Sequence, residues 1–490
     1  MPFPQHKTKI VATIGPASES TRVLRDMLRS GMNIARLNFS HGSKSAHAET
    51  IKKIRAAAES VDRQVAIMAD LPGPKMRIGE LAKETIKIEN GHHFTLTVAD
   101  IIGDERGVSV SFSGLPQAVK TGDRLFLNDG YIELEALEIA GDEVHCKVLI
   151  GGLLRSRKGL NLPGIDLGIG AFTDNDRNWL EFAAKQGIDA VSQSFVESAK
   201  DVLAVRRAAE KLGYQPFVIA KIERARARDN IDEILESADG IMIARGDLGV
   251  EIPIEQIANA QKYIMRKANT RGKPVITATQ LLESMIHNRR PTRAEATDVA
   301  NAILDGTDGV MLSGESAMGD YPVESVAMLA RIAAATEPHC SNNHVMEAIG
   351  NKRPDKGVNP QDLIALSVAA TVSRITPPTI VVPTRGGATA RRIARFRLPA
   401  WISAVSSERK TCQDLLFSYG VYPLCQTEHP DTWKAWVCKW MKRLKLEGDL
   451  VLVTEGPSRK HPGRNNRMEI IDLRDLTARC TPDASIASTD

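Results

Sequence analysis

Residues 219–249 read IAKIERARARDNIDEILESADGIMIARGDLG, and this stretch indicates both the fold and the site. It contains two apolar, strand-like runs, of which the first ends in Lys221 and Glu223 and the second in Gly246 and Asp247. Hard divalent cations take oxygen ligands, and a lysine can neutralise charge on a bound phosphate or enolate. A lysine and two carboxylates at the ends of neighbouring strands therefore predict an enzyme with a metal and an anion site.

The same pattern, a short apolar run that closes on polar residues and precedes a helical stretch, occurs eight times. Eight such units predict an α/β fold, a (β/α)₈ TIM barrel, in which the chemistry lies at the carboxyl ends of the strands. A doubly wound sheet is the alternative on pattern alone. The runs are IVATIG (10–15), NIARLNFS (33–40), VAIMAD (65–70), DAVSQSF (189–195), FVIAKIE (217–223), GIMIARGD (240–247), PVITATQ (274–280) and GVMLSGES (309–316).

The barrel pattern is interrupted once and then ends, which predicts three domains. Residues 74–163 alternate in polarity between glycine-containing turns, so we expect an inserted all-β domain that acts as a lid over the active site. Residues 338–490 alternate helices with the runs TIVVPT, WISAVS, VYPLCQ, DLVLVTEG and MEIIDL, which predicts an open α/β domain for regulation or assembly. Residues 1–73 together with 164–337 then form the barrel.

The composition excludes several classes of protein. With 490 residues, 42% hydrophobic and 25% charged, the balance is that of an ordinary globular enzyme, and a net charge of +4 gives no reason to expect a nucleic-acid partner. No run approaches the length of a membrane span, and the first residues lack the apolar core of a signal peptide. Six cysteines without CxxC pairing suggest reduced thiols, so a cytoplasmic location is expected.

Several long blocks resemble the pyruvate kinase family, in the family's order and over nearly the whole chain. The resemblance implies a magnesium- or manganese-dependent enzyme of glycolysis that moves the phosphoryl group of phosphoenolpyruvate to ADP. The resemblance also implies that the products are pyruvate and ATP, formed through enolpyruvate stabilised by the metal, and that the assembly is a homotetramer. The blocks, besides residues 219–249, are KIVATIGPAS, GMNIARLNFSHG, RKGLNLPG, GKPVITATQLLESM and PTRAEATDVANAILDGTDGVMLSGESAMGDYP.

The resemblance assigns roles to individual residues at the strand ends. Glu223 and Asp247 match the Mg²⁺ ligands, and Lys221 matches the lysine that contacts the transferring phosphoryl group. Thr279 matches a contact to the substrate carboxylate; because a hydroxyl is a weak acid, the proton is expected through water or a relay that also includes Ser313 and Glu315. The catalytic and substrate-binding residues implied in this way are Arg36, Arg77, Lys221, Gly246, Asp247, Thr279, Ser313 and Glu315.

The nucleotide is expected to lie between the barrel and the inserted domain. Lys158 matches a contact to the nucleotide phosphates that forms when the lid closes, and Asp129 matches a lid carboxylate that meets the barrel. The family usually has a second acid where this chain has Asn128, so closure is expected to be tuned differently. The nucleotide-binding residues implied are Asn38, His41, Arg77, Lys158 and Asp129.

The third strand departs from the family at residues 70–75, which read DLPGPK where DTKGPE is typical. Asn38, Ser40, Asp70 and Leu71 still match a possible or vestigial K⁺ site. Lys75 replaces the family's glutamate, and its ammonium group can supply the positive charge of the cation. We therefore expect that the enzyme does not require K⁺.

A candidate effector site lies in the C-terminal domain. TRGGATA (384–390) resembles the effector loop of the family and implies a phosphorylated metabolite bound by Thr384, Arg385, Gly386, Gly387 and Thr389. The basic stretch RRIARFR (391–397) is interpreted either as part of a phosphate-binding surface or as a solvated helix face. Trp433, Trp436 and Trp440, at helical spacing, are expected to be packing residues.

Two other functions remain as alternatives. A pyruvate or phosphoenolpyruvate aldolase on a related barrel would use the same metal and arginine but would lack the nucleotide lid of residues 74–163. A metabolite sensor without catalysis would have lost part of the set formed by Lys221, Glu223, Asp247 and Thr279, all of which are present. The identity of the effector and the degree of cooperativity are left open by the sequence.

Overall fold

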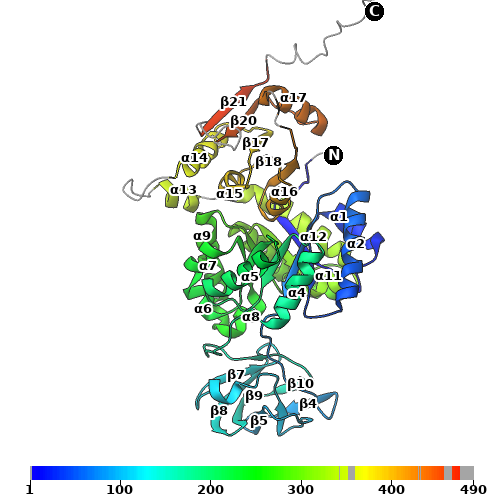
Figure 1. Ribbon diagram of the computed structural model, residues 1–490, viewed down its shortest axis with the longest axis vertical. Coiled ribbons are helices and arrows are strands. Elements are labelled where there is room, and N and C mark those ends of the chain that lie inside the picture. Colours follow the sequence, from blue (N-terminus) through cyan, green and yellow to red (C-terminus); the bar gives the residue numbers. More distant parts are fainter. Residues whose placement is uncertain are drawn as a thin grey trace, which may run out of the picture.

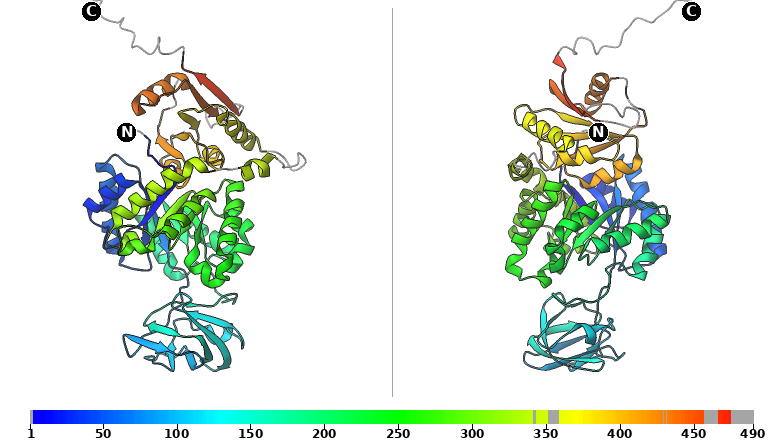
Figure 2. Two further views of the ribbon diagram at one scale, coloured as in Figure 1. Left: turned by 180° about the vertical axis from the view of Figure 1, so that it is seen from behind. Right: turned by 60° about the vertical axis from the view of Figure 1, so that its left-hand side comes forward.

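The chain folds into three bodies arranged in a row, as the computed structural model shows (Figure 1). The barrel is in the middle, the inserted β domain is at one end and the C-terminal α/β domain is at the other, and two further views show the same order (Figure 2). The structure describes residues 3–340, 343–350, 359–428, 430, 432–456 and 466–474. In this described part, no helix has the length and apolar character needed to cross a membrane.

The central sheet is a closed barrel of eight parallel strands in the order β1-β16-β15-β14-β13-β12-β3-β2. This finding confirms the (β/α)₈ barrel and excludes the doubly wound sheet, and each predicted apolar run overlaps one strand to within one residue at its start or end, or contains it. The strands are β1 (Lys9–Thr13), β2 (Met32–Asn38), β3 (Ala66–Leu71), β12 (Ala190–Gln193), β13 (Phe217–Ile222), β14 (Gly240–Ala244), β15 (Val275–Ala278) and β16 (Gly309–Leu312).

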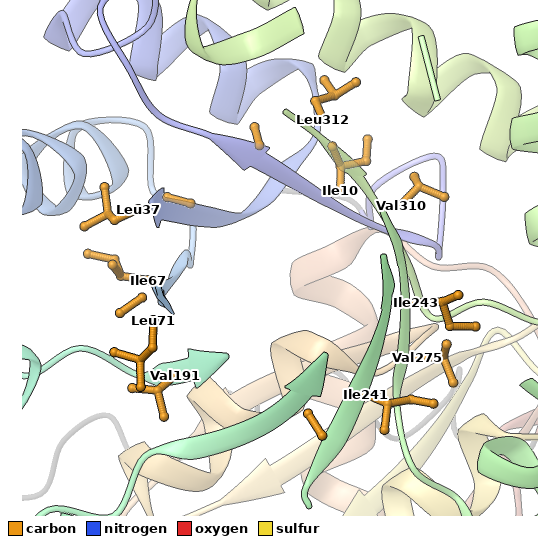
Figure 3. Packing of buried hydrophobic residues seen from close by; sticks show 14 of the residues in the cluster. Ile10, Leu37, Ile67, Leu71, Val191, Ile241, Ile243, Val275, Val310 and Leu312 are labelled. Atoms are coloured by element: carbon orange, nitrogen blue, oxygen red, sulfur yellow. The ribbon is translucent and has the colours of Figure 1, made fainter. Parts of the chain in front are cut away.

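Successive residues of each strand face opposite sides of the barrel wall. In β1, Ile10 packs outward against the surrounding helices, whereas Val11 packs inside the barrel. Figure 3 shows the outward set, with Ile10, Leu37 and Ile67 on adjacent strands. Because both faces are buried, the strands must be apolar throughout, and the sequence shows continuous apolar runs for this reason.

Helices connect the strands on the outside of the barrel, and several begin at a hydroxyl side chain. Ser20, Ser43, Thr173 and Thr292 each accept a hydrogen bond from a backbone N–H of the first helical turn. The helices of this domain are α1 (Thr21–Ser30), α2 (Lys44–Ser60), α4 (Asp174–Lys185), α5 (Ala199–Lys211), α6 (Ala225–Asp229), α7 (Ile231–Ser237), α8 (Arg245–Glu251), η1 (Ile254–Gln256), α9 (Ile257–Arg271), η2 (Glu283–Ile286), α10 (Arg293–Leu304), α11 (Gly314–Ala317), α12 (Pro322–Thr336) and η3 (Glu337–His339).

The inserted domain is a β structure with its own core, as predicted. Its main sheet has the order β11-β7-β8-β9-β5-β6, and β4 pairs with β10 in a second, two-stranded sheet. Phe94, Leu96, Leu125 and Leu134 are fully buried in its centre. Its elements are β4 (Thr85–Ile88), β5 (His93–Thr97), β6 (Gly107–Ser109), α3 (Leu115–Ala118), β7 (Arg124–Leu127), β8 (Ile132–Ala140), β9 (Glu143–Ile150), β10 (Gly152–Arg155) and β11 (Leu160–Asn161).

The C-terminal domain is an open sheet with helices, also as predicted. Its strand order is β19-β18-β17-β20-β21, in which only the edge strand β21 is antiparallel. Trp433 is buried in its core, and Trp436 stacks on Trp440, so the three tryptophans are packing residues. The elements are α13 (Asn343–Gly350), α14 (Pro360–Val372), β17 (Thr379–Pro383), α15 (Ala388–Ala394), β18 (Trp401–Ser406), α16 (Arg409–Asp414), η5 (Leu415–Phe417), β19 (Val421–Cys425), α17 (Trp433–Leu444), β20 (Leu450–Glu455) and β21 (Arg467–Asp472).

The C-terminal domain closes the amino-terminal end of the barrel. Phe417 enters the interior cluster and stacks on Phe217 with ring centroids 4.9 Å apart. Lys9, at the start of β1, donates to the carbonyl oxygen of Val421 at 2.7 Å. The barrel interior is therefore sealed by side chains at the end opposite to the inserted domain.

The basic stretch 391–397 belongs to this contact, which corrects both interpretations of it. Arg397 is buried and donates to both oxygens of Asp308 at 2.8 Å, and its guanidinium lies 4.9 Å from the ring centre of Tyr419. Arg395 is also buried and donates to the carbonyl oxygen of Thr270 at 3.1 Å. These two arginines dock one domain on the other; they are neither a solvated helix face nor an open phosphate surface.

Removal of the Arg397 side-chain charge should weaken the domain contact. Asp308 also accepts the backbone N–H groups of Val275 and Tyr419, so Arg397→Met leaves a buried carboxylate without its counter-ion. Such a loss typically costs about 3–5 kcal/mol of the free energy of unfolding. Urea denaturation followed by tryptophan fluorescence measures the change. The control Arg29→Met removes an exposed pair with Asp26 and should cost less than about 1 kcal/mol; equal effects would contradict the prediction.

Candidate active site

A small polar cavity lies at the carboxyl ends of the barrel strands, on the side of the inserted domain. Its volume is about 100 Å³, and residues from seven of the eight barrel strands or the loops after them line it. This is the end of a TIM barrel at which chemistry is expected. The residues that line it are Arg36, Asn38, Ser40, Asp70, Pro72, Lys75, Ser194, Phe195, Lys221, Glu223, Met242, Ala244, Asp247, Ala278, Thr279, Met311 and Ser313.

Asp70, in β3, connects the charged groups of the cavity. Its carboxylate accepts from Nε of Arg36 at 3.0 Å and from Oγ of Ser192 at 2.8 Å. It also lies 3.3 Å from Nζ of Lys221. Burial alone would raise the pKa of Asp70, but Lys221 and Arg36 outweigh burial and lower that pKa to about 2. Asp70 is therefore an anion that holds two cations in place.

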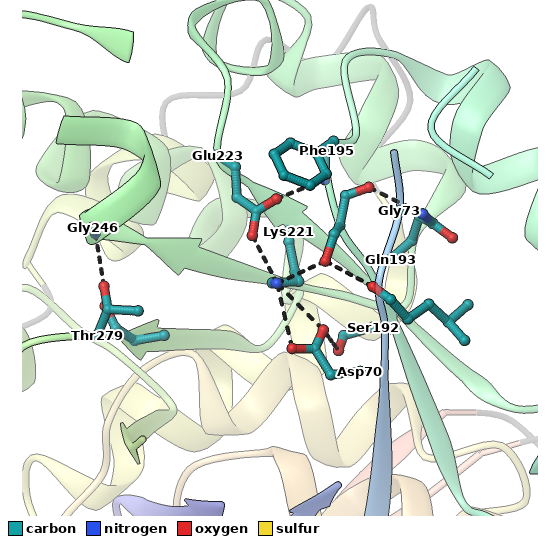
Figure 4. A network of polar contacts seen from close by, with 12 residues as sticks. Asp70, Gly73, Ser192, Gln193, Phe195, Lys221, Glu223, Gly246 and Thr279 are labelled. Atoms are coloured by element: carbon teal, nitrogen blue, oxygen red, sulfur yellow. Dashed lines mark hydrogen bonds and ion pairs between the residues drawn. The ribbon is translucent and has the colours of Figure 1, made fainter. Parts of the chain in front are cut away.

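Lys221, in β13, is the cation at the centre of the cavity (Figure 4). Its Nζ lies 2.7 Å from Oε1 of Glu223 and donates to Oγ of Ser194 at 2.8 Å. Burial would lower the pKa of Lys221, but Asp70 and Glu223 raise it above its ordinary value. The ammonium group thus stays charged, fixed in a site from which most water is excluded, where a charge acts strongly on a bound anion.

Glu223 and Asp247 line the same cavity at the ends of the neighbouring strands β13 and β14 and fit a divalent cation. The other oxygen of Glu223 accepts the backbone N–H of Phe195 at 2.7 Å, which fixes the carboxylate. Burial raises the pKa of Glu223, Lys221 opposes this, and the charge of Asp247 raises it further. Two like charges that repel in one cavity are relieved by a cation between them. Mg²⁺ commonly uses one or two carboxylates and takes its remaining ligands from water and substrate phosphates.

Within the described residues, no cluster of three or more metal-binding side chains of the His, Cys, Asp and Glu types is found. A two-carboxylate site is consistent with this result, because it leaves positions for substrate oxygens. The donor set is made of oxygens only, which suits Mg²⁺ or Mn²⁺ better than softer metals. The pair Glu223 and Asp247 is therefore the candidate metal site of this chain.

Thr279 follows β15 in a backbone conformation that is rare for a β-branched residue. Its φ is +67°, and Gln280 after it has φ +53°. The Thr279 hydroxyl accepts the backbone N–H of Gly246 at 2.7 Å, and Figure 4 shows this link between the ends of β14 and β15. Strained conformations at such positions persist when the surroundings fix them, and they are frequent at active sites.

Gly246 lies in the first turn of α8 and permits this close approach. A Cβ atom at Gly246 would come within 3.3 Å of the Thr279 hydroxyl. Arg245, next to it, donates to the carbonyl oxygen of Thr279 at 3.1 Å and pairs with Asp298 at 2.7 Å. Helix α8 and the loop after β15 are thus held together by three residues around the cavity mouth.

Several predicted site residues do not line this cavity. Glu315 is buried, with one oxygen accepting the N–H of Ser313 at 2.7 Å and the other that of Leu282 at 3.2 Å. Burial raises the pKa of Glu315. It therefore positions the backbone at Ser313, which does line the cavity, and its part in a proton relay stays a prediction. Leu71 is buried and offers its carbonyl oxygen, which accepts from Ser194 at 2.8 Å.

The predicted nucleotide residues surround the cavity instead of lining it, apart from Asn38. His41 is exposed after β2, and its pKa is lowered by burial and by the cations Arg77, Lys75 and Arg36. Arg77 donates to the carbonyl oxygen of Arg157 at 2.9 Å within the inserted domain. Lys158 and Asp129 also lie in that domain and do not reach the cavity in this structure.

The turn that carries Asp129 points toward the barrel. Asn128 and Asp129 have φ values of +53° and +57°, and a Cβ atom at Gly130 would lie 3.3 Å from Val250 of α8. Since α8 also carries Asp247, this turn is next to the helix that bears a candidate metal ligand. The inserted domain thus meets the barrel at the active-site end.

Lys75 lies where its charge can act on the same site. It lines the cavity together with Asn38, Ser40 and Asp70, three of the residues expected for a monovalent cation. The side-chain oxygen Oδ1 of Asn38 already accepts the backbone N–H of Ser40 at 3.1 Å. The hypothesis of K⁺ independence requires a positive charge near the expected cation position, and Lys75 lines the cavity there.

Sequence reasoning missed the contribution of β12. Ser192 binds Asp70, Ser194 binds Lys221, and the N–H of Phe195 binds Glu223. Phe195 has φ +57°, which turns its N–H toward the carboxylate. The signal was present, because these residues end the predicted run 189–195, but none of the three carries a charge.

The candidate effector loop is a tight turn between β17 and α15. The Thr384 hydroxyl accepts the N–H of Gly387 at 3.0 Å, and Gly387 has φ +78°. Arg385 is exposed, and nothing would contact a Cβ atom at Gly386 within 4 Å. The loop therefore exposes the cationic side chain of Arg385 and the backbone at Gly386. The N–H of Gly387 is not available to a ligand, because it already donates to the Thr384 hydroxyl.

Helix α8 ends in Glu251. This residue lies near Gly164, in the segment that leads from the inserted domain back to the barrel. Glu251 lies 3.6 Å from Arg224 and accepts the backbone N–H groups of Ala225 and Gly164. Burial, assisted by the charge of Glu197, raises the pKa of Glu251 to about 7, although Arg224 opposes the shift. A carboxylate that titrates near neutral pH thus sits between α8 and the connecting segment.

Comparisons with known proteins agree along the chain. Residues 5–326 match the family model described as pyruvate kinase, barrel domain, and residues 362–471 match that described as pyruvate kinase, alpha/beta domain. A pyruvate kinase of Thermococcus litoralis is 48% identical over 475 residues, which cover 95% of this chain and 98% of that protein. A pyruvate kinase of Geobacillus stearothermophilus is 41% identical over 485 residues, covering 97% of this chain and 82% of that protein.

The raised pKa of Glu251 predicts a pH dependence of stability. Between its ordinary pKa of 4.5 and about 7, the folded protein holds a proton that the unfolded chain has lost, so the free energy of unfolding falls as pH rises. Glu251→Gln should remove this decrease, which amounts to at most about 3 kcal/mol. Denaturant unfolding at pH 5 and pH 8 measures it. Glu210→Gln, at an exposed helix position, should keep the wild-type slope; a Glu251→Gln slope equal to wild type would contradict the prediction.

Proposed function

Since the chain belongs to the pyruvate kinase family, and so transfers the phosphoryl group of phosphoenolpyruvate to ADP in glycolysis, we propose that this reaction takes place in the cavity around Lys221. The observation that carries the proposal is the position of the Lys221 ammonium group, which lies 2.7 Å from Glu223 and 3.3 Å from Asp70. Arg36, Asp247 and Thr279 line the same cavity. Cations and metal-binding carboxylates thus converge at one point, as phosphoryl transfer requires.

Glu223 and Asp247 would hold Mg²⁺ or Mn²⁺ in this proposal. When bound, the metal supplies positive charge that neutralises phosphate and enolate oxygens. The protein holds Glu223 in place through the N–H of Phe195, and Asp247 sits in the first turn of α8. Burial and, to a smaller extent, the charge of Asp247 raise the pKa of Glu223, and a cation between the two carboxylates would offset both effects.

Arg36 and Lys221 bind the transferring phosphoryl group in this proposal. The guanidinium group of Arg36 donates to Asp70 and, at 2.9 Å, to the hydroxyl of Thr13, and these two contacts fix its orientation. Charge develops on the enolate oxygen as the P–O bond breaks, and the fixed ammonium group of Lys221 stabilises that charge more than it stabilises the bound substrate. Enolpyruvate then takes a proton at carbon to become pyruvate.

The proton is proposed to arrive from the side of Thr279 and Ser313, which follow β15 and β16 and line the same cavity. A hydroxyl is too weak an acid to act alone, so water in contact with these groups completes the relay. Glu315 holds the N–H of Ser313 and serves this relay as a positioning residue. Gly246 contributes a backbone N–H whose bond to the Thr279 hydroxyl a substrate carboxylate can replace.

ADP is proposed to bind between the barrel and the inserted domain. Asn38, His41 and Arg77 lie on the barrel side or at the connection, and Lys158 and Asp129 come from the inserted domain. The contact of the turn at Gly130 with α8 supports closure in this direction. A lid of this kind excludes water from the transfer step. Its presence is why phosphoryl transfer is preferred over an aldolase reaction at the same barrel.

Regulation and assembly are further parts of the proposal. The open loop around Arg385 and Gly386 supports an effector site for a phosphorylated metabolite. Thr384, Gly387 and Thr389 would also bind the metabolite there. The homotetramer and the cytoplasmic location stay predictions. The boundaries of the three domains at residues 73, 163 and 337 also stay predictions.

Lys221→Met tests the proposed site. We expect the turnover of phosphoenolpyruvate with ADP to fall by on the order of 10²-fold or more, since one preorganised charge is lost in the transition state. A coupled assay of pyruvate formation measures turnover, and circular dichroism shows whether the variant is folded. Lys267→Met removes a surface lysine that pairs with Asp232 and should keep normal turnover. Near-normal turnover of folded Lys221→Met would remove Lys221 from the mechanism.

Lys75→Glu tests the replacement of K⁺. The wild-type enzyme should be active in tetramethylammonium buffer without K⁺, because the Lys75 ammonium group supplies the charge beside Asp70. The variant should gain a response to KCl on the order of tenfold, which corresponds to about 1.4 kcal/mol of transition-state stabilisation. The control Lys83→Glu lies in the exposed pair with Glu105 and should respond as wild type does. A wild-type enzyme that is nearly inactive until KCl is added would refute the hypothesis.

A further inference from the structure

Two thiols of the C-terminal domain lie side by side. Cys412 is in α16 and Cys425 is the last residue of β19, and the Cys425 thiol lies near enough to raise the pKa of the Cys412 thiol. Ser406, at the end of β18, lies next to both: it pairs with Cys425 in the sheet, and its carbonyl oxygen is 3.9 Å from the Cys412 sulfur. Both cysteines are therefore adjacent to Ser406, and this placement brings the two residues into one neighbourhood, as a disulfide requires.

The two thiols differ in access to solvent. Cys425 is exposed and lines a cavity of about 1030 Å³ between the barrel and the C-terminal domain. Cys412 is 4% exposed, and burial together with the neighbouring thiol raises the pKa of Cys412 to about 12. An oxidant in solution thus reacts with Cys425 first. The buried Cys412 can then react only with the oxidised sulfur of Cys425.

We propose that Cys412 and Cys425 form a reversible disulfide when the protein meets a peroxide. The Cys425 thiolate attacks one peroxide oxygen, the O–O bond breaks, and the products are a sulfenic acid and, after proton uptake, one water. The Cys412 thiol attacks the Cys425 sulfur, the S–O bond breaks, and the hydroxyl leaves as a second water with the Cys412 proton. Two thiols are oxidised and one peroxide is reduced; a dithiol reverses the step.

The bond would lie beside the loop that begins at Thr384. Thr411, next to Cys412 in α16, donates to the carbonyl oxygen of Arg385 at 2.6 Å. Ser406, the sheet partner of Cys425, donates to the same oxygen at 3.3 Å. A Cys412–Cys425 bond joins α16, which holds this carbonyl group through Thr411, to β19, which pairs with the strand that carries Ser406, so oxidation restricts the motion of the loop.

The same elements contact the barrel. Gln413, which follows Cys412, donates to the carbonyl oxygen of Val65 at 3.5 Å, and Gln64 donates to the carbonyl oxygen of Pro423 in β19 at 3.2 Å. Figure 1 shows α16 at the face of the C-terminal domain that meets the barrel. The thiol pair therefore lies at the domain boundary, away from the cavity that holds Lys221.

Mass spectrometry of the full-length protein tests the proposal. The protein is treated with a small molar excess of hydrogen peroxide, its remaining thiols are alkylated in denaturant, and it is digested without reduction. We expect the loss of two hydrogen atoms per chain, a cross-linked peptide pair that contains Cys412 and Cys425, and reversal by dithiothreitol. Amide hydrogen exchange at residues 384–389 should be slower in the oxidised protein than in the reduced protein.

Two variants make the result specific. Cys425→Ser, at an exposed position that should tolerate the change, should abolish the cross-link and the slower exchange. Cys438→Ser, in α17, should keep both. A stable sulfinic acid on Cys425 with Cys412 still open to alkylation, or a cross-link to a second chain, would overturn the disulfide. Unchanged exchange at residues 384–389 in the cross-linked protein would overturn its action on the loop.

Discussion

Four charged groups share one small cavity inside the barrel, and the rest of the structure serves to hold them there. Arg36, Asp70, Lys221 and Glu223 are each at most 9% exposed, so none of them is solvated as in water. Unpaired charges in such a place would cost several kcal/mol each, and pairing offsets that cost only when the geometry is fixed. The closed barrel fixes it, because all the strands end at one rim and cannot slide against each other.

The same rigidity gives the groups their chemistry. Asp70 keeps its charge and holds Arg36 and Lys221, whereas Glu223 is pushed toward protonation by burial and by Asp247. A site that combines two carboxylates suited to a metal with cations held in fixed positions can take both a metal and a phosphate. The neutral donors of β12 complete it, since they satisfy the remaining oxygens and the ammonium group.

The barrel strands also join the two ends of the domain. Strand β16 starts beside Asp308, which binds Arg397 of the C-terminal domain, and ends beside Ser313 in the cavity. Strand β3 starts beside Val65, which is contacted by Gln413, and carries Asp70 near its other end. A change in the docking of the C-terminal domain therefore acts on strands whose far ends carry site residues. The candidate effector loop and the thiol pair both lie in the domain that docks on these strands.

The sequence determined the elements and the charged part of the site. Continuous apolar runs gave the strands within a few residues, because strands buried on both faces must be apolar. The charges at their ends showed which residues meet, since parallel strands in a barrel end at a common rim. Alternating polarity marked the inserted β domain in the same way, through the period of two residues of a half-buried strand.

Only the tertiary structure decided which polar groups contact each other across distant segments. It brought Arg397, which reads as one more charge on a basic helix, into a buried pair with Asp308, 89 residues away in sequence. It supplied Ser192, Ser194 and the N–H of Phe195 as ligands of charged groups, although uncharged residues and backbone atoms carry no pattern of their own. It also placed Cys412 beside Cys425, without the CxxC spacing that sequence reading looks for. Periodicity and composition record burial, whereas these contacts depend on how the domains and loops pack.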